Sequence, residues 1–210
     1  MAATPTGARL LLGADLAATS LFALEGAIEG ANARIDVFGV LVVAFATAMS
    51  GGIIRDLLIG AVPPATLRTV VFPVAAFSAG LIVIAAHQIV ESVPSWLITG
   101  LDAAGLGLFA VVGAAKALDY GMNWLLAILL GTIAAVGGST VRDVLLNHVP
   151  AVLRVDVYAT AALLGALVLV AAIKSGVGRA AAMAMGAGVC FTLRVVAASQ
   201  DWNLPKVRSS

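Results

Sequence analysis

Two short polar motifs with nearly the same residues lie inside strongly apolar segments of the chain. Residues 51–56 read Gly-Gly-Ile-Ile-Arg-Asp, and residues 137–143 read Gly-Gly-Ser-Thr-Val-Arg-Asp. An ionised arginine or aspartate at the centre of a bilayer costs at least about 2.5–3.5 kcal/mol on insertion scales. A fold that keeps both segments in a membrane must therefore pair or hydrate the charges of Arg55, Asp56, Arg142 and Asp143.

The composition indicates that these segments do lie in a membrane. Of the 210 residues, 61% are hydrophobic and 11% are charged, whereas soluble domains have about 45–50% apolar and about 25% charged residues. One soluble core cannot bury this excess, so we predict an all-α integral membrane protein. The net charge of +1 offers no basic surface for nucleic acid. The single Cys190 excludes a disulfide within one chain, and the sequence contains no metal-ligand cluster.

Seven apolar segments are long enough to cross a bilayer, which takes about 20 residues. Pro63 and Pro150 end the second and the fifth, because proline lacks the amide hydrogen of a continuing helix. We expect both of these spans to be broken at their glycine pairs, with the freed backbone groups facing protein or water. The predicted spans, within one membrane domain of residues 1–210, are approximately 9–30, 35–62, 69–90, 95–118, 122–148, 155–174 and 178–199.

The two motifs belong to a longer internal repeat. At an offset of 87 positions, further identities appear: Asp15 with Asp102, Phe22 with Phe109, Gly26 with Gly113, and Pro63 with Pro150. We predict a first repeat over 9–90, a second over 95–174 and an unpaired seventh span over 178–199. A unit of three spans ends on the side opposite to its start, so the second repeat enters the membrane inverted. Such 3+3 inverted repeats place the functional site near the middle of the membrane, between the repeats.

Adjacent residues on a helix do not face each other, so we expect the motif charges to pair between the repeats, Arg55 with Asp143 and Arg142 with Asp56. Two interpretations of the motifs remain open. In one, the charges line or close a polar path along the broken helices. In the other, they form a structural clamp, and the glycines only allow two helices to approach closely.

The hydroxyl groups of Ser50, Ser139 and Thr140 have two interpretations as well. They could cap the half-helices that follow the glycine pairs and line a path. Alternatively, each could donate to a carbonyl of the preceding turn, as serine and threonine often do within helices.

Further charged residues are weaker candidates. Asp15 and Asp102 each lie about two turns into the first span of a repeat, and their matched positions favour a role beyond packing. Lys116, near the end of the fourth span, either extends to the membrane surface or responds to voltage by moving in the membrane field. We expect Glu25 to be a solvated charge at the rim and Arg194 to be an interfacial anchor.

With these motifs in place, the sequence resembles the trimeric intracellular cation (TRIC) channel family in its prokaryotic branch. The resemblance implies a homotrimer in the inner (plasma) membrane, with an outside N-terminus, a cytoplasmic C-terminus and a potassium-conducting pore in each protomer. It also implies that the kinked second and fifth helices bound the pore and that Lys116 is the candidate voltage-sensitive residue. The pore and gating candidates are Asp15, Ser50, Gly51, Gly52, Arg55, Asp56, Asp102, Lys116, Gly137, Gly138, Ser139, Thr140, Arg142 and Asp143.

The leading functional hypothesis is a monovalent cation channel that prefers potassium and also passes sodium, since nothing resembles the carbonyl filter of tetrameric potassium channels. The alternative is a secondary transporter for a small zwitterion such as glycine, because inverted repeats with broken helices are typical of transporters. An enzyme is not expected, because no nucleophile–base set is present. The expected partners are two further copies of the chain and membrane lipid, with no nucleic acid, no cofactor and no resident metal.

Overall fold

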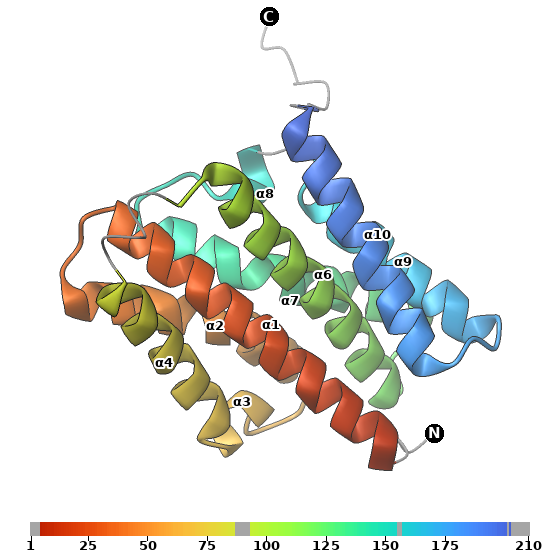
Figure 1. The fold of residues 1–210 in the computed structure, drawn as a ribbon. Coiled ribbons are helices and arrows are strands. Elements are labelled where there is room, and N and C mark those ends of the chain that lie inside the picture. Colours follow the sequence, from red (N-terminus) through yellow and green to blue (C-terminus); the bar gives the residue numbers. More distant parts are fainter. Residues whose placement is uncertain (1–4, 87–92, 155–156, 201, 203–210) are drawn as a thin grey trace, which may run out of the picture.

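The computed structural model describes residues 5–86, 93–154, 157–200 and 202, and these residues form a bundle of helices (Figure 1). The predicted end of the third span at Val90 lies outside them. The helices of the described residues are α1 (Pro5–Asn32), α2 (Val37–Leu58), α3 (Ala65–Arg68), α4 (Val71–Ala85), α6 (Ser95–Asp119), α7 (Trp124–Leu145), α8 (Ala151–Arg154), α9 (Ala159–Lys174) and α10 (Arg179–Ser199).

Five of these helices, α1, α2, α6, α7 and α10, are long and apolar enough to cross a membrane. The other two apolar helices, α4 and α9, have 15 and 16 residues. At 1.5 Å per residue they are about 22–24 Å long, shorter than the roughly 30 Å hydrocarbon core. The short helices α3 and α8, which the sequence did not predict, precede them. The all-α prediction is confirmed, with five candidate spans.

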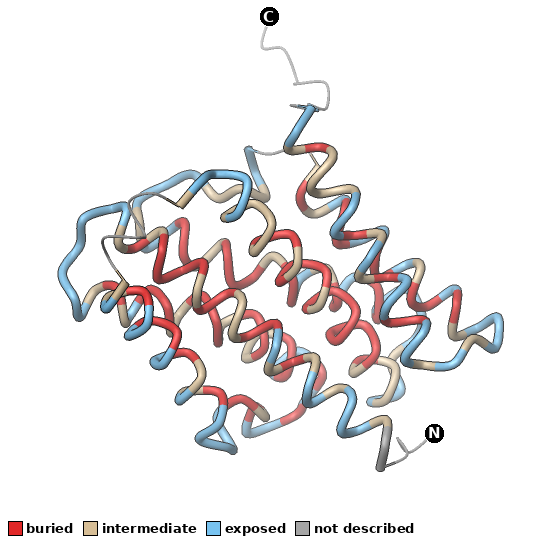
Figure 2. The backbone as a smooth tube through the Cα atoms, viewed as in Figure 1, coloured by how far each residue is buried: buried red, intermediate tan, exposed pale blue. Residues whose placement is uncertain are grey.

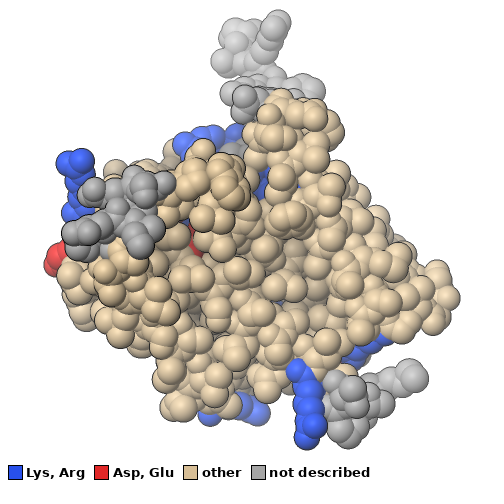
Figure 3. All heavy atoms as spheres, in the orientation of Figure 1, with Lys and Arg blue, Asp and Glu red and all other residues tan. Residues whose placement is uncertain are grey.

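The outer surface of the bundle suits a lipid environment. Figure 2 shows the buried residues on the inward sides of the helices and exposed residues on the outside. Large apolar side chains are among the exposed ones, such as Leu81, 55% exposed, and Ile82, 61% exposed. In the view of Figure 3 most of the surface carries no charge, and lysine and arginine side chains lie near its margins. Lipid tails rather than water would cover such a surface at little cost.

The helices α2 and α7 begin and end in the same way, 87 positions apart. Asp36 caps α2 by accepting a hydrogen bond from Gly39 N at 2.7 Å, and Asn123 caps α7 by accepting one from Leu126 N at 2.9 Å. At the other ends, Gly60 and Asn147 have positive φ angles of 75° and 57°. Residues in this left-handed conformation end each helix, so matching residues cap and end α2 and α7 in the two repeats.

The predicted breaks at the glycine pairs are wrong, because α2 and α7 are continuous helices through these residues. The glycines instead lie where the two helices cross. A Cβ atom on Gly51 would overlap the carbonyl oxygen of Ala134, and one on Gly138 would overlap the carbonyl oxygen of Thr47. These two contacts are related by the offset of 87 positions. Close helix approach, the structural interpretation of the glycines, is therefore what the backbone requires here.

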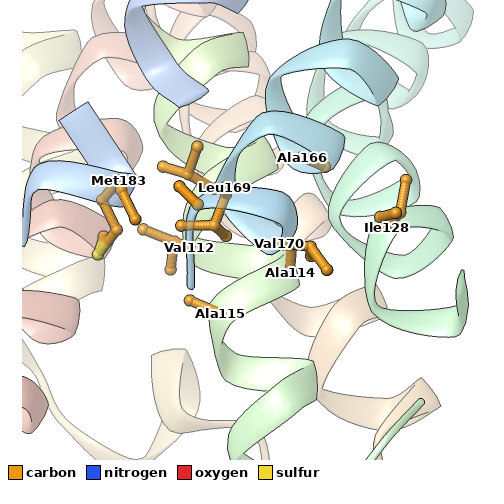
Figure 4. Packing of buried hydrophobic residues seen from close by; sticks show 11 residues of the cluster. Val112, Ala114, Ala115, Ile128, Ala166, Leu169, Val170 and Met183 are labelled. Carbon is orange, nitrogen blue, oxygen red and sulfur yellow. The ribbon is translucent and has the colours of Figure 1, made fainter. Parts of the chain in front are cut away.

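The first helices of the two repeats, α1 and α6, pack side by side and run in opposite directions (Figure 1). Phe22 of α1 and Phe109 of α6, which match in the repeat, pack with ring centroids 5.1 Å apart. Matched residues that touch lie on a pseudo-two-fold axis, as an inverted repeat requires. Side chains from α6, α7, α9 and α10 form one apolar cluster (Figure 4), which includes Val111, Val112, Ala114, Ala115, Ile128, Ala166, Leu169, Val170, Ala172, Ala182 and Met183.

We predict that Gly51→Ala destabilises the protein by about 1–3 kcal/mol, the usual cost of overpacking a tight contact. Gly13→Ala in α1 is the matched control, because a Cβ atom on Gly13 would meet no atom within 4 Å. The measurement is unfolding of both variants in mixed micelles. An equal effect of the two substitutions would show that the crossing is not close-packed.

Candidate functional site

Arg55 is the centre of a first charge cluster, which comprises Asp15, Arg55, Asp56 and Lys116. Its guanidinium is fully buried and donates from Nη1 and Nη2 to the two carboxylate oxygens of Asp15, each at 2.9 Å. Its Nε donates to Oδ1 of Asp56 at 2.8 Å. A two-pronged contact of this kind is the strongest geometry between arginine and a carboxylate. It joins α1 to α2.

Asp56 collects the remaining donors of the first cluster. Lys116 of α6 donates from Nζ to both carboxylate oxygens of Asp56, at 2.7 and 2.8 Å, and the backbone N of Ala65 donates to Oδ2 at 2.8 Å. The cluster contains two acids and two bases and is therefore neutral, as a low-dielectric interior requires. Lys116 thus extends to a buried carboxylate rather than to the membrane surface.

A second charge cluster surrounds Arg142. Arg142 donates from Nε and Nη2 to Oδ1 of Asp143, at 2.9 and 2.7 Å, and from Nη1 to Oε1 of Glu25. Oδ2 of Asp143 accepts from the backbone N of Ala151 at 2.7 Å, as Asp56 does from α3. The second cluster comprises Glu25, Asp102, Ser139, Arg142, Asp143, Tyr158 and Arg194.

Asp102 accepts hydrogen bonds from two other members of the second cluster. It accepts from the Tyr158 hydroxyl at 2.6 Å and from Nε of Arg194 at 3.1 Å. The Tyr158 hydroxyl also lies 2.8 Å from Oγ of Ser139, and the Arg194 guanidinium lies 5.0 Å from the Tyr158 ring centroid. The helix α10, which follows the second repeat, is therefore tied to that repeat through a buried acid.

The predicted pairs Arg55–Asp143 and Arg142–Asp56 are wrong. Arg55 pairs with Asp15 and Arg142 with Glu25, both on α1. The crossing of α2 and α7 lies at Gly51 and Gly138, so each arginine follows its crossing by about one turn, where the two helices diverge. The expectation that an arginine and the next residue do not pair is also wrong, because the long arginine side chain turns back and its Nε reaches the neighbouring carboxylate.

The hydroxyl groups do not cap half-helices, since α2 and α7 continue through them. Ser50 donates to the carbonyl of Ala46 at 2.5 Å, and Thr140 donates to that of Val136 at 2.7 Å. Ser139 lies 3.1 Å from the same carbonyl of Val136. Bonding to the preceding turn, the second interpretation of these hydroxyls, is confirmed.

Sequence reasoning missed the roles of Glu25, Tyr158 and Arg194. Glu25 is 2% exposed and does not lie at a solvated rim. It is ten residues after Asp15 on α1, a distance of about 15 Å along the axis, so one helix supplies an acid to both clusters. The available signal was a mismatch in the repeat: the position that matches Glu25 holds Val112, so Glu25 is an acid without a counterpart in the first cluster.

Two cavities adjoin the clusters. The Asp15 cavity, about 300 Å³, is lined by the early part of α1 and the late part of α6. The Glu25 cavity, about 200 Å³, is lined by the late part of α1 and the early part of α6. They therefore lie toward opposite ends of the bundle. Matched residues line them in the order Asp15 cavity/Glu25 cavity: Leu11/Ile98, Leu12/Thr99, Asp15/Asp102, Val112/Glu25 and Lys116/Glu29.

Similar sequences cover nearly the whole chain. A family model described as Glycine transporter matches residues 12–88 and 99–174, two ranges that begin 87 positions apart. The chain is 33% identical over 192 residues to the inner membrane protein YadS of Escherichia coli (strain K12). The aligned residues cover 91% of this chain and 93% of YadS.

Solved structures are similar over the same extent. The TRIC trimeric intracellular cation channel orthologue from Rhodobacter sphaeroides gives a TM-score of 0.86 at 30% identity, over 92% of this chain and 99% of that one. A structure that addresses conductance through TRIC cation channels gives a TM-score of 0.85 at 36% identity, over 94% of this chain and 97% of that one.

We predict strong energetic coupling between Arg55 and Asp15 and none between Arg55 and Asp143. In a double-mutant cycle, residues in contact show interaction energies of about 0.5–3 kcal/mol, whereas distant residues add to within about 0.3–0.5 kcal/mol. The cycles combine Arg55→Gln with Asp15→Asn and, as the control, Arg55→Gln with Asp143→Asn. Unfolding in mixed micelles gives the energies. A larger interaction energy in the control cycle than in the Arg55–Asp15 cycle would contradict this prediction and support pairing of Arg55 with Asp143.

Proposed function

This chain belongs to the prokaryotic branch of the TRIC channel family, and on that premise we propose that it is a potassium-preferring cation channel of the inner membrane. The observation that carries the proposal is similarity to TRIC cation channels along nearly the whole chain, so the resemblance includes the residues around both charge clusters. We further propose seven spans, with α4 and α9 crossing between longer neighbours, an outside N-terminus and a cytoplasmic C-terminus.

The proposed path runs through one protomer, from the Asp15 cavity to the Glu25 cavity past the crossing of α2 and α7. Acids at both cavities, Asp15 and Asp102 among them, favour cations over anions. At the crossing, the glycines bring two backbones together and leave no open passage, so conduction requires α2 and α7 to separate. Three protomers form the assembly, each with its own path, and membrane lipid fills the spaces between them.

The two arginines give the path its closed state. Each arginine is held in place by two carboxylates, Arg55 by Asp15 and Asp56 and Arg142 by Glu25 and Asp143, and a guanidinium beside the path repels a permeating cation. A movement that swings either guanidinium aside would remove this barrier. Without a ring of carbonyl oxygens to replace the hydration shell, selectivity between potassium and sodium is expected to be modest.

A carrier for a small zwitterion such as glycine is the second candidate, and one observation favours it: the matching family model is described as Glycine transporter. The Glu25 cavity contains both arginine and carboxylate side chains, which could bind the two charged ends of an amino acid. Opposed cavities that never join would then be the two access routes of a carrier.

Recording from the purified protein in planar bilayers separates the two functions. We predict discrete unitary currents carried by potassium, a smaller sodium current and a reversal potential that follows the cation gradient. The companion measurement is uptake of labelled glycine into proteoliposomes. Saturable glycine uptake without unitary currents would contradict the channel and support the carrier.

We predict that Lys116→Met weakens the voltage dependence of the open probability. Lys116 is the lysine of the first cluster and is partly buried, and a charge that crosses the full field contributes about 2.3 kcal/mol per 100 mV. Lys174→Met, which removes a lysine that lies over the Trp124 ring, is the control. The slope of open probability against voltage is the measurement, and an unchanged slope in Lys116→Met would exclude it as a voltage-sensitive residue.

A further inference from the structure

Glu25 carries a buried carboxylate oxygen that lacks a partner. Oε1 accepts from Arg142, but Oε2 is buried without a hydrogen-bond partner, one of three such side-chain atoms in the described residues. An unpaired carboxylate oxygen away from water is costly, and a bound water or ion is one way in which a native structure satisfies such an atom. Glu25 lines the Glu25 cavity, so the cavity can supply that partner.

The two repeats hold their matching arginines with different acids. The matching arginine, Arg55, is satisfied by Asp15 and Asp56 alone, and the residue that matches Glu25 is the apolar Val112. In the second repeat, Arg194 of α10 takes the acid that matches Asp15. Glu25 thus replaces that acid beside Arg142 and is a carboxylate with no counterpart in the first cluster.

The charge balance of the two cavities differs accordingly. Four carboxylates line the Glu25 cavity, Glu25, Glu29, Asp102 and Asp143, against the three guanidiniums of Arg142, Arg154 and Arg194, which leaves one acid in excess when His148 is neutral. In the Asp15 cavity the lining acids Asp15 and Asp119 are paired with Arg55 and Arg179, and Lys116 is paired with Asp56.

We propose that the Glu25 cavity binds a monovalent cation of potassium size, with Oε2 of Glu25 as a ligand. This proposal rests on the proposed cation-channel function, and the site is the place where a permeating cation binds on its way through the protein. At about 30 Å³ for each water molecule, the roughly 200 Å³ cavity has room for an ion that keeps several waters. Glu29, Asp102 and Thr99 provide further oxygen atoms in its lining.

The first test compares the melting temperature of the purified protein in potassium chloride and in N-methyl-D-glucamine chloride at equal ionic strength. A cation that binds only the folded state raises the melting temperature with its concentration. We expect a potassium-specific rise that Glu25→Gln abolishes, since the amide keeps the shape but loses the charge. Asp36→Asn is the control: it removes one acid elsewhere, and Asn123 shows that asparagine can cap the matching helix.

The second test needs no variant and so covers the case in which Glu25→Gln does not fold. Crystals of the unmodified protein in rubidium chloride should give an anomalous peak in the Glu25 cavity and none in the Asp15 cavity. Absence of this peak, or stabilisation by glycine without any by potassium, would overturn the proposal.

Bilayer recording on the same purified protein distinguishes failure of the proposed cation site from failure of the proposed channel. Unitary currents without a potassium-specific rise and without a rubidium peak contradict the site and leave the channel in place. A rubidium peak in a protein that passes no unitary current contradicts the channel and supports the site.

Discussion

The close crossing of α2 and α7 is the contact on which the rest of the structure depends. Gly51 and Gly138 each lie against a carbonyl oxygen of the other helix, so the two backbones touch where side chains would normally separate them. Beyond this contact the helices diverge and carry Arg55 and Arg142 to opposite sides of the crossing. Each arginine then meets an acid of α1, which passes both sites. Two glycines thus decide where four buried charges lie and which partners they can reach.

The two halves share a backbone plan and differ in charge. Caps, helix ends, the bond from a short helix to Asp56 or Asp143, and the matched phenylalanines recur at 87 positions. The differences lie at the cavities, where Val112 and Lys116 match Glu25 and Glu29, and where Arg194 comes from a helix without a counterpart. The symmetric scaffold therefore carries cavities of unlike charge toward its two ends, and the proposed channel would treat cations that enter from the two ends unequally.

The sequence was sufficient for the elements that depend on composition and spacing. Apolar length predicted the helices, and the two Arg-Asp pairs revealed the repeat and the family. Sequence reasoning failed where the answer depends on a distant part of the chain. Whether Gly51 breaks a helix or admits a neighbour depends on Ala134, and the partner of Arg55 depends on which face of α1 it meets. The environment of Glu25 also depends on a distant part of the chain, because only packing against α7 shows that Glu25 is buried beside Arg142 rather than solvated.

The central claim is that the two repeats are inverted, so that matched cavities open to opposite faces of the membrane. Leu12 and Thr99 match in the repeat and line the Asp15 and Glu25 cavities. With Cys190 replaced by alanine, Leu12→Cys and Thr99→Cys can be treated with a membrane-impermeant thiol reagent in right-side-out and inverted membrane vesicles. The account predicts that each cysteine reacts in one vesicle type and that the two types differ. Reaction of both cysteines from the same face would contradict it.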